Sequence, residues 1–227
     1  MKNITILALD TSSKICSVSL NINGIAIATF ESAVSNMASE HLDRFVNQII
    51  NDHQLDLKQI NAVAIAKGPG SYTGLRISAS YAKGLCYSLQ IPLIAINTLE
   101  GMANQIYSAL LDDDWLICPM LDARRMEVYT AMYDSRYTCV KDTEAVILDD
   151  IFFESIKQKT ILIGDGANKA KLFIKNFNQF KVIDSIYPSA KQIGYLAYNR
   201  FLEKKFESIA YFEPLYLKEF LIKEKKN

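Results

Sequence analysis

Short apolar runs separated by turn residues open the chain. Residues 4–9 form a continuous apolar run that ends in a polar turn, and residues 16–20 alternate with a period of two. Asn23-Gly24 follows, and this pair favours a tight hairpin because both central positions of a type I′ turn take positive φ angles. Residues 25–30 return as a third segment. The pattern predicts a three-stranded β-meander whose first turn is rich in hydroxyl groups.

Helical periodicity begins after the meander, over residues 39–52, with Ser39 as the expected N-cap. The apolar positions there fall at i, i+3, i+4, i+7 and i+8, and they are Leu42, Phe45, Val46, Ile49 and Ile50. We then expect strands over residues 62–66 and 91–96, a helix over residues 75–89, and a third helix capped by Thr98. A meander that leads into βαβ units predicts an α/β fold with a mixed sheet and helices on its faces.

Three consecutive aspartates at residues 112–114 interrupt this pattern and mark a boundary. We expect an N-terminal lobe over residues 1–111 and a smaller α/β lobe over residues 112–227, because 227 residues suffice for two modest cores. Further elements are expected after the boundary, namely strands over 115–121, 127–133, 140–148 and 161–163 and helices over 149–158 and 190–204. The second half therefore suggests a shorter, degraded copy of the first.

Composition narrows the classes of function. The 25 basic and 25 acidic residues cancel, so charge does not predict direct binding of nucleic acid. The lysine-rich segment over residues 218–226 is typical of a frayed, solvated end. The four cysteines are scattered, the first residues lead directly into a strand, and no apolar run approaches the ~20 residues that span a bilayer. These features predict a cytoplasmic protein with reduced cysteines.

Residues 68–74 contain three glycines and a proline between a predicted strand and a predicted helix. The spacing is neither that of a Walker A loop nor that of a nucleophile elbow. Two interpretations stay open, a structural turn and a loop whose backbone N–H groups bind an anion. Asp10-Thr11-Ser12, at the carboxyl end of the first strand, allows a phosphate or Mg²⁺ contact or a capped turn.

Other candidate groups do not assemble into a catalytic set. His41 and His53 lie twelve positions apart on or just after one helix, roughly 18 Å, which is too far to share a metal. Arg124 and Arg125 follow the sixth predicted strand, where one of them is expected in an ion pair between the lobes. Gly164-Asp165-Gly166 is typical of a tight turn, with a contact to an adenosine as the alternative.

Four motifs of this sequence occur together, in this order, in the TsaB family, also called YeaZ. The chain resembles that family over about residues 4–210. The motifs are Asp10-Thr11-Ser12 with Cys16-Ser17-Val18, residues 68–77 with Ala82-Lys83-Gly84-Leu85, residues 122–129, and Gly164-Asp165-Gly166. The resemblance implies a two-lobe fold of the actin, Hsp70 and sugar-kinase type, which is ribonuclease H-like and has mixed sheets.

The resemblance also implies a non-catalytic protein that pairs with the catalytic subunit TsaD and acts with the ATPase TsaE. Their complex forms threonylcarbamoyladenosine (t6A) at position 37 of tRNAs that read ANN codons, and this chain meets tRNA only through that complex. ATP and metal belong to the partner subunits. Asp10, Thr11 and Ser12 are then a vestigial phosphate loop. The metal-binding histidine pair of TsaD falls at about Ala38 and Leu42, both apolar here.

By the same resemblance, the helices over residues 39–52 and 75–89 contact TsaD, and the isolated chain forms a homodimer through the same patch. The expected contact residues are Leu42, Phe45, Ile49, Ile77, Tyr81, Gly84 and Leu85. A deeply buried helix is the alternative explanation for apolar residues on more than one side of residues 75–89. The alternative function is an ATP-dependent kinase-like enzyme, but Ser12 replaces the usual glycine of such loops and no base carboxylate is evident.

Overall fold

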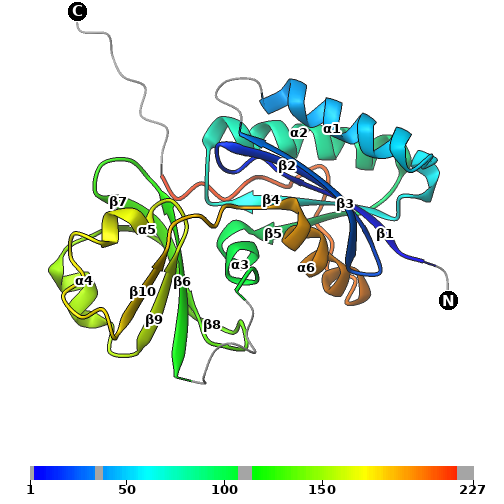
Figure 1. The fold of residues 1–227 in the computed structure, drawn as a ribbon. Coiled ribbons are helices and arrows are strands. Elements are labelled where there is room, and N and C mark those ends of the chain that lie inside the picture. Colours follow the sequence, from blue (N-terminus) through cyan, green and yellow to red (C-terminus); the bar gives the residue numbers. More distant parts are fainter. Residues whose placement is uncertain (1–2, 34–37, 107–113, 219–227) are drawn as a thin grey trace, which may run out of the picture.

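The computed structural model describes residues 3–33, 38–106 and 114–218, which form two five-stranded sheets (Figure 1). The first sheet has the order β3-β2-β1-β4-β5. Its strands are β1 (Thr5–Asp10), β2 (Ile15–Ile22), β3 (Ile25–Ala33), β4 (Ala62–Gly68) and β5 (Leu93–Asn97). The first three pair antiparallel, whereas β1, β4 and β5 are parallel. The predicted meander and mixed sheet are confirmed.

Helices cover both faces of the first sheet. The helices α1 (Ala38–Asp52) and α2 (Tyr72–Leu89) share a core with Leu7 and Leu9 of β1. Helix α6 (Ala190–Leu202) packs with Ile6 and Ala8, the alternate residues of the same strand. Because successive side chains of a strand point to opposite faces, α6 lies across the sheet from α1 and α2.

The second sheet repeats this topology. Its order is β10-β9-β6-β7-β8, with an antiparallel β6-β7-β8 meander and parallel β6, β9 and β10. The strands are β6 (Trp115–Asp122), β7 (Glu127–Tyr133), β8 (Cys139–Ile147), β9 (Lys159–Ile163) and β10 (Phe180–Ile183), and the helices are α4 (Asp150–Ser155) and α5 (Ala167–Ala170). The predicted relation between the two halves is thus confirmed at the level of strand order.

Several element boundaries differ from the prediction. Helix α2 begins at Tyr72, three residues early, because the Ser71 side chain accepts a hydrogen bond from Gly74 N and caps it. Thr98 is the first residue of α3 (Thr98–Ala103), and Asn97 is its cap. The 3-10 turn η1 (Leu57–Gln59), α5 and β10 were not predicted.

The chain returns to the first lobe at its end. The predicted boundary at residues 111–112 lies outside the described residues, and α6, placed in the predicted second lobe, packs on the first sheet. Residues 207–218, called here the C-terminal segment, continue along that lobe and reach the β6–β7 turn at Lys218. Glu207 N donates to Leu93 O at 2.9 Å, and Phe212 is buried in the core of the first lobe. Within the described part of the chain, no helix is long and apolar enough to cross a membrane.

Candidate functional site

The glycine loop between β4 and α2 packs against the turn that follows β1. A Cβ atom on Gly74 would lie 1.8 Å from the Thr11 carbonyl oxygen, and one on Gly70 would lie 2.2 Å from that of Ser12. The Thr11 hydroxyl donates to Gly74 O at 2.7 Å, and Ser71 N donates to Ser12 O at 2.6 Å. These contacts support the structural-turn interpretation, since they require glycine and use the polar groups internally.

The predicted cofactor residues Asp10, Thr11 and Ser12 are each at most 2% exposed. The Asp10 Oδ1 atom accepts hydrogen bonds from Ser12 N at 2.9 Å and from the Ser12 hydroxyl at 2.6 Å. Its Oδ2 atom has no partner among the described residues. Burial raises the pKa of the Asp10 carboxyl to about 6, although the Ser12 hydrogen bonds oppose this, and Glu31 adds a smaller increase.

Replacement of Asp10 by asparagine is expected to change the pH dependence of stability. Because the pKa is higher in the folded protein than in the unfolded chain, the wild type loses stability as the pH rises from about 4 to above 6, by up to ~3 kcal/mol. Asparagine keeps an acceptor for Ser12 without this loss. Urea titrations at pH 4.5 and pH 7.5 measure the free energy of unfolding of both proteins. The free energy of unfolding of the variant, relative to that of the wild type, should be larger at pH 7.5 than at pH 4.5. An equal difference at both pH values would contradict the prediction.

The outer face of α2 carries a groove of about 490 Å³. It is lined by Tyr72, Thr73, Arg76, Ile77, Ser80 and Tyr81. The Tyr81 hydroxyl donates to Asp43 Oδ1 of α1 at 3.1 Å, and burial raises the pKa of this phenol above its usual range. Gly84 is exposed further along the same face, and a Cβ atom there would meet nothing within 4 Å. We call Ile77, Ser80, Tyr81, Gly84 and Leu85 the α2 outer face.

The structure divides the predicted contact residues into two groups. Ile77, Tyr81 and Leu85 are half-buried beside Gly84, so the four α2 residues do share a surface. Those on α1 do not: Leu42, Phe45 and Ile49 are at most 5% exposed and pack in the core. We therefore remove these three from the expected contact surface. The apolar stripe of α1 faces its own sheet, which is the usual role of such a stripe.

The turn between β6 and β7 differs from its prediction. Among the described residues, no ion pair involves Arg124 or Arg125, and both side chains are exposed. Lysines pair with the carboxylates of this turn instead: Lys169 of α5, in the same lobe, pairs with Asp122 at 2.7 Å, and Lys218 of the C-terminal segment pairs with Glu127. Sequence analysis did not predict these two ion pairs, because each lysine lies far along the chain from its partner. No local pattern of charges links them.

The motif Gly164-Asp165-Gly166 forms a tight turn after β9. The Asp165 Oδ1 atom accepts a hydrogen bond from Asp122 N at 3.0 Å, and Gly164 has a φ of +103°. A Cβ atom on Gly164 would lie 2.4 Å from Met120 O, so glycine is required here for both conformation and space. These contacts support the tight-turn interpretation.

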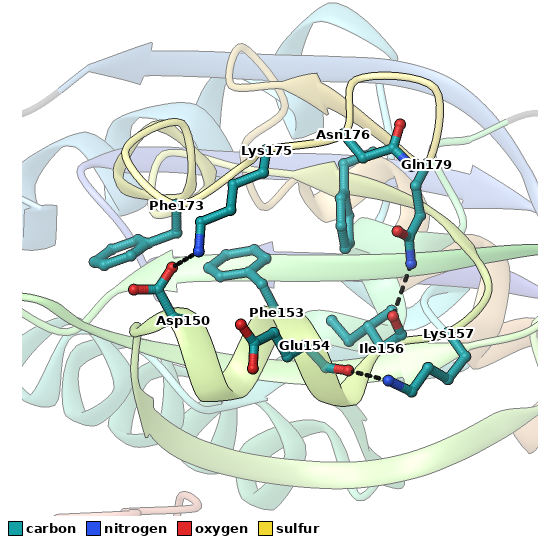
Figure 2. Close-up of a pocket in the computed structure, with 10 residues that line it drawn as sticks. Asp150, Phe153, Glu154, Ile156, Lys157, Phe173, Lys175, Asn176 and Gln179 are labelled. Atoms are coloured by element: carbon teal, nitrogen blue, oxygen red, sulfur yellow. Dashed lines mark hydrogen bonds and ion pairs between the residues drawn. The ribbon is translucent and has the colours of Figure 1, made fainter.

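A second hollow, of about 470 Å³, lies in the second lobe between α4 and residues 173–180 (Figure 2). Phe153 packs there against Phe173 and Phe180, with ring centroids 5.8 and 5.6 Å apart. The polar groups around it are used internally, because Lys175 pairs with Asp150 at 2.7 Å and Gln179 donates to Ile156 O (Figure 2). We therefore do not place the candidate site in this hollow.

Among residues 3–33, 38–106 and 114–218, no group of three or more His, Cys, Asp or Glu side chains is placed to hold a metal ion. Of the two positions that the resemblance led us to compare with a histidine pair, the side chain of Ala38 is not among those described, and Leu42 is buried. His41 contacts Arg44 instead, with the two nitrogens 3.0 Å apart.

Comparison with known proteins gives a consistent assignment. The family model described as "TsaD: tRNA N6-adenosine threonylcarbamoyltransferase" matches residues 32–225. A protein of Escherichia coli named tRNA threonylcarbamoyladenosine biosynthesis protein TsaB is 30% identical, with 94% of each chain covered. The protein of the same name from Bacillus subtilis is 34% identical over 76% of each chain.

The fold has a close counterpart among solved structures. The structure of YeaZ from Pseudomonas aeruginosa has a TM-score of 0.81 with 23% identity, over 94% of this chain and 100% of that one. Together with the two mixed sheets, this match confirms the predicted fold of the actin, Hsp70 and sugar-kinase type.

Proposed function

This chain belongs to the TsaB (YeaZ) family of tRNA threonylcarbamoyladenosine biosynthesis proteins, and we propose that it is the non-catalytic partner of a TsaD-like subunit. In this proposal the complex, with a TsaE-like ATPase, forms t6A at position 37 of ANN-decoding tRNAs in the cytoplasm. ATP and metal are bound by the partner subunits. The isolated chain pairs with a second copy through the surface that otherwise meets TsaD.

The observation that carries the proposal is the α2 outer face. Gly84 lies on the side of the helix opposite the buried residues Leu75, Ala82 and Cys86, and it leaves room for a second helix to approach. Half-buried Ile77 and Tyr81 flank it, which gives the face an apolar centre. A small residue at the centre of such a face permits close helix packing. Covering the half-buried apolar neighbours removes their remaining apolar surface from water, which stabilises the association.

A kinase-like function is less well supported. Transfer of a phosphoryl group needs an open loop that holds the phosphates and a base that positions the nucleophile. Asp10 is instead buried behind the glycine loop, and the nearest hydroxyl groups, on Thr11 and Ser12, are used within the protein. The purified wild-type chain should therefore show no ATP turnover. Clear turnover would contradict the proposal that the chain is non-catalytic.

Replacement of Gly84 by arginine is expected to weaken association with the cognate TsaD-like subunit by about 100-fold or more, because a long charged side chain would block the close approach. The variant should fold normally, since Gly84 has open space around it. Co-purification and titration calorimetry measure the effect. Tyr195→Arg is the matched control, because Tyr195 is 51% exposed on α6, across the sheet. Equal binding by both variants would exclude the α2 outer face as the contact.

A further inference from the structure

Cationic side chains pack against aromatic rings at two places that the C-terminal segment links, one in each lobe. The Arg76 guanidinium lies 4.2 Å from the centroid of the Tyr72 ring, and the Tyr72 and Tyr216 rings are 4.8 Å apart. Further on, the Lys218 ammonium lies 5.6 Å from the centroid of the Tyr129 ring. We call these residues, together with Arg124 and Arg125, the basic ridge.

The C-terminal segment forms hydrogen bonds with both lobes along the ridge. Leu215 N donates to Lys67 O near the end of β4 at 2.7 Å, and the Lys218 ammonium donates to Ala123 O at 3.3 Å. Three residues of extended chain span at most ~10 Å, so the end of β4 and the β6–β7 turn lie within that distance plus one lysine side chain. Both lobes therefore contribute residues to the ridge.

The β6–β7 turn places its two arginines under backbone constraint. Arg124 has a φ of +71° and Arg125 a φ of +49°, in the left-handed region that arginine rarely adopts. The two carboxylates of the turn are already paired, Asp122 with Lys169 and Glu127 with Lys218. The exposed arginines thus add two positive charges that no carboxylate balances within the described residues. Residues held in this sparsely populated region cost conformational energy, and such residues cluster at functional sites.

We propose that the basic ridge binds a single-stranded segment of RNA, with Arg124 and Arg125 at its phosphates. The inference deepens the proposed function and rests on it, because the tRNA would then contact this chain within the complex. The combination of rings and cations favours RNA over an acidic protein surface, since bases stack on rings while guanidinium groups bind phosphates. The zero net charge of the whole chain is compatible, because the ridge is a local feature.

The test uses the complex of this chain with its TsaD-like subunit and, as probe, an unmodified transcript of an ANN-decoding tRNA. Binding is measured between 50 and 200 mM salt for wild type and for Arg124→Gln/Arg125→Gln. Loss of two phosphate contacts should weaken binding about 10-fold near 0.1 M salt and reduce the slope of log K against log salt by ~1.4. Arg124→Lys/Arg125→Lys should restore most of the slope.

Lys58→Gln/Lys204→Gln is the control, because it removes the same charge at exposed positions away from the ridge. Wild-type affinity and slope in the arginine variant would overturn the proposal, and so would an equal loss in the control. If the arginine variant instead loses the TsaD-like subunit, the turn contacts protein and the RNA site is rejected. Failure of the wild-type chain to bind that subunit would refute the proposed function, which is a separate readout.

Discussion

Replacement of Gly74 by alanine is expected to destabilise the protein by about 3 kcal/mol or more. A Cβ atom at this position would lie 1.8 Å from the Thr11 carbonyl oxygen, which belongs to the backbone and has no flexible end that can swing away. Separation of the two segments would also weaken the hydrogen bond from the Thr11 hydroxyl to Gly74 O. The free energy of unfolding from urea titrations, read by circular dichroism, measures the loss.

Gly84→Ala is the matched control, because both glycines lie in α2 and both receive the same methyl group. Gly84 is exposed, with nothing within 4 Å of a Cβ atom, so alanine there should stabilise the helix by ~0.5–1 kcal/mol through its higher helix propensity. The two variants should therefore move in opposite directions. Wild-type stability in Gly74→Ala would mean that the glycine loop separates from the Asp10 turn at little cost in free energy. The interpretation of this loop as a ligand-binding loop would then regain support.

Much of the fold could be predicted because its strands are marked by local patterns. The runs at residues 4–9 and 62–66 are almost wholly apolar, and the corresponding strands are buried on both sides. The missed elements carry little pattern. Strand β10 has four residues at a sheet edge, and α5 also has four, which is too short for helical periodicity to appear.

The candidate site was less predictable, because its contacts join distant parts of the chain. The glycine loop is recognisable from its composition, whereas its contact with Thr11 and Ser12 spans about sixty residues of sequence and follows from the pairing of β1 with β4. Lys218 was placed in a solvated end, yet its ammonium bonds to Ala123 O and Glu127. Local charge patterns cannot reveal a partner that only the tertiary fold supplies.

Periodicity likewise identified the apolar stripe of α1 but not what the stripe contacts. Leu42→Ala is therefore expected to destabilise the fold by about 3–5 kcal/mol, since Leu42 is fully buried and truncation leaves a cavity. Thermal and urea unfolding measure this loss. Under conditions where the variant remains folded, its affinity for the TsaD-like subunit should change little, because the side chain has no exposed surface to offer.

Ile77→Ala should show the opposite pattern to Leu42→Ala, with a small loss of stability and a clear loss of affinity for the partner. Ile77 is half-buried on the α2 outer face, so truncation is expected to lower stability by only about 1 kcal/mol while weakening association about 10-fold. The pair separates packing within the chain from contact with a partner, although both residues occupy apolar helical positions in the sequence. A loss of partner affinity in Leu42→Ala as large as that in Ile77→Ala, at equal folded fraction, would show that α1 rearranges on binding and that its core residues reach the partner after all.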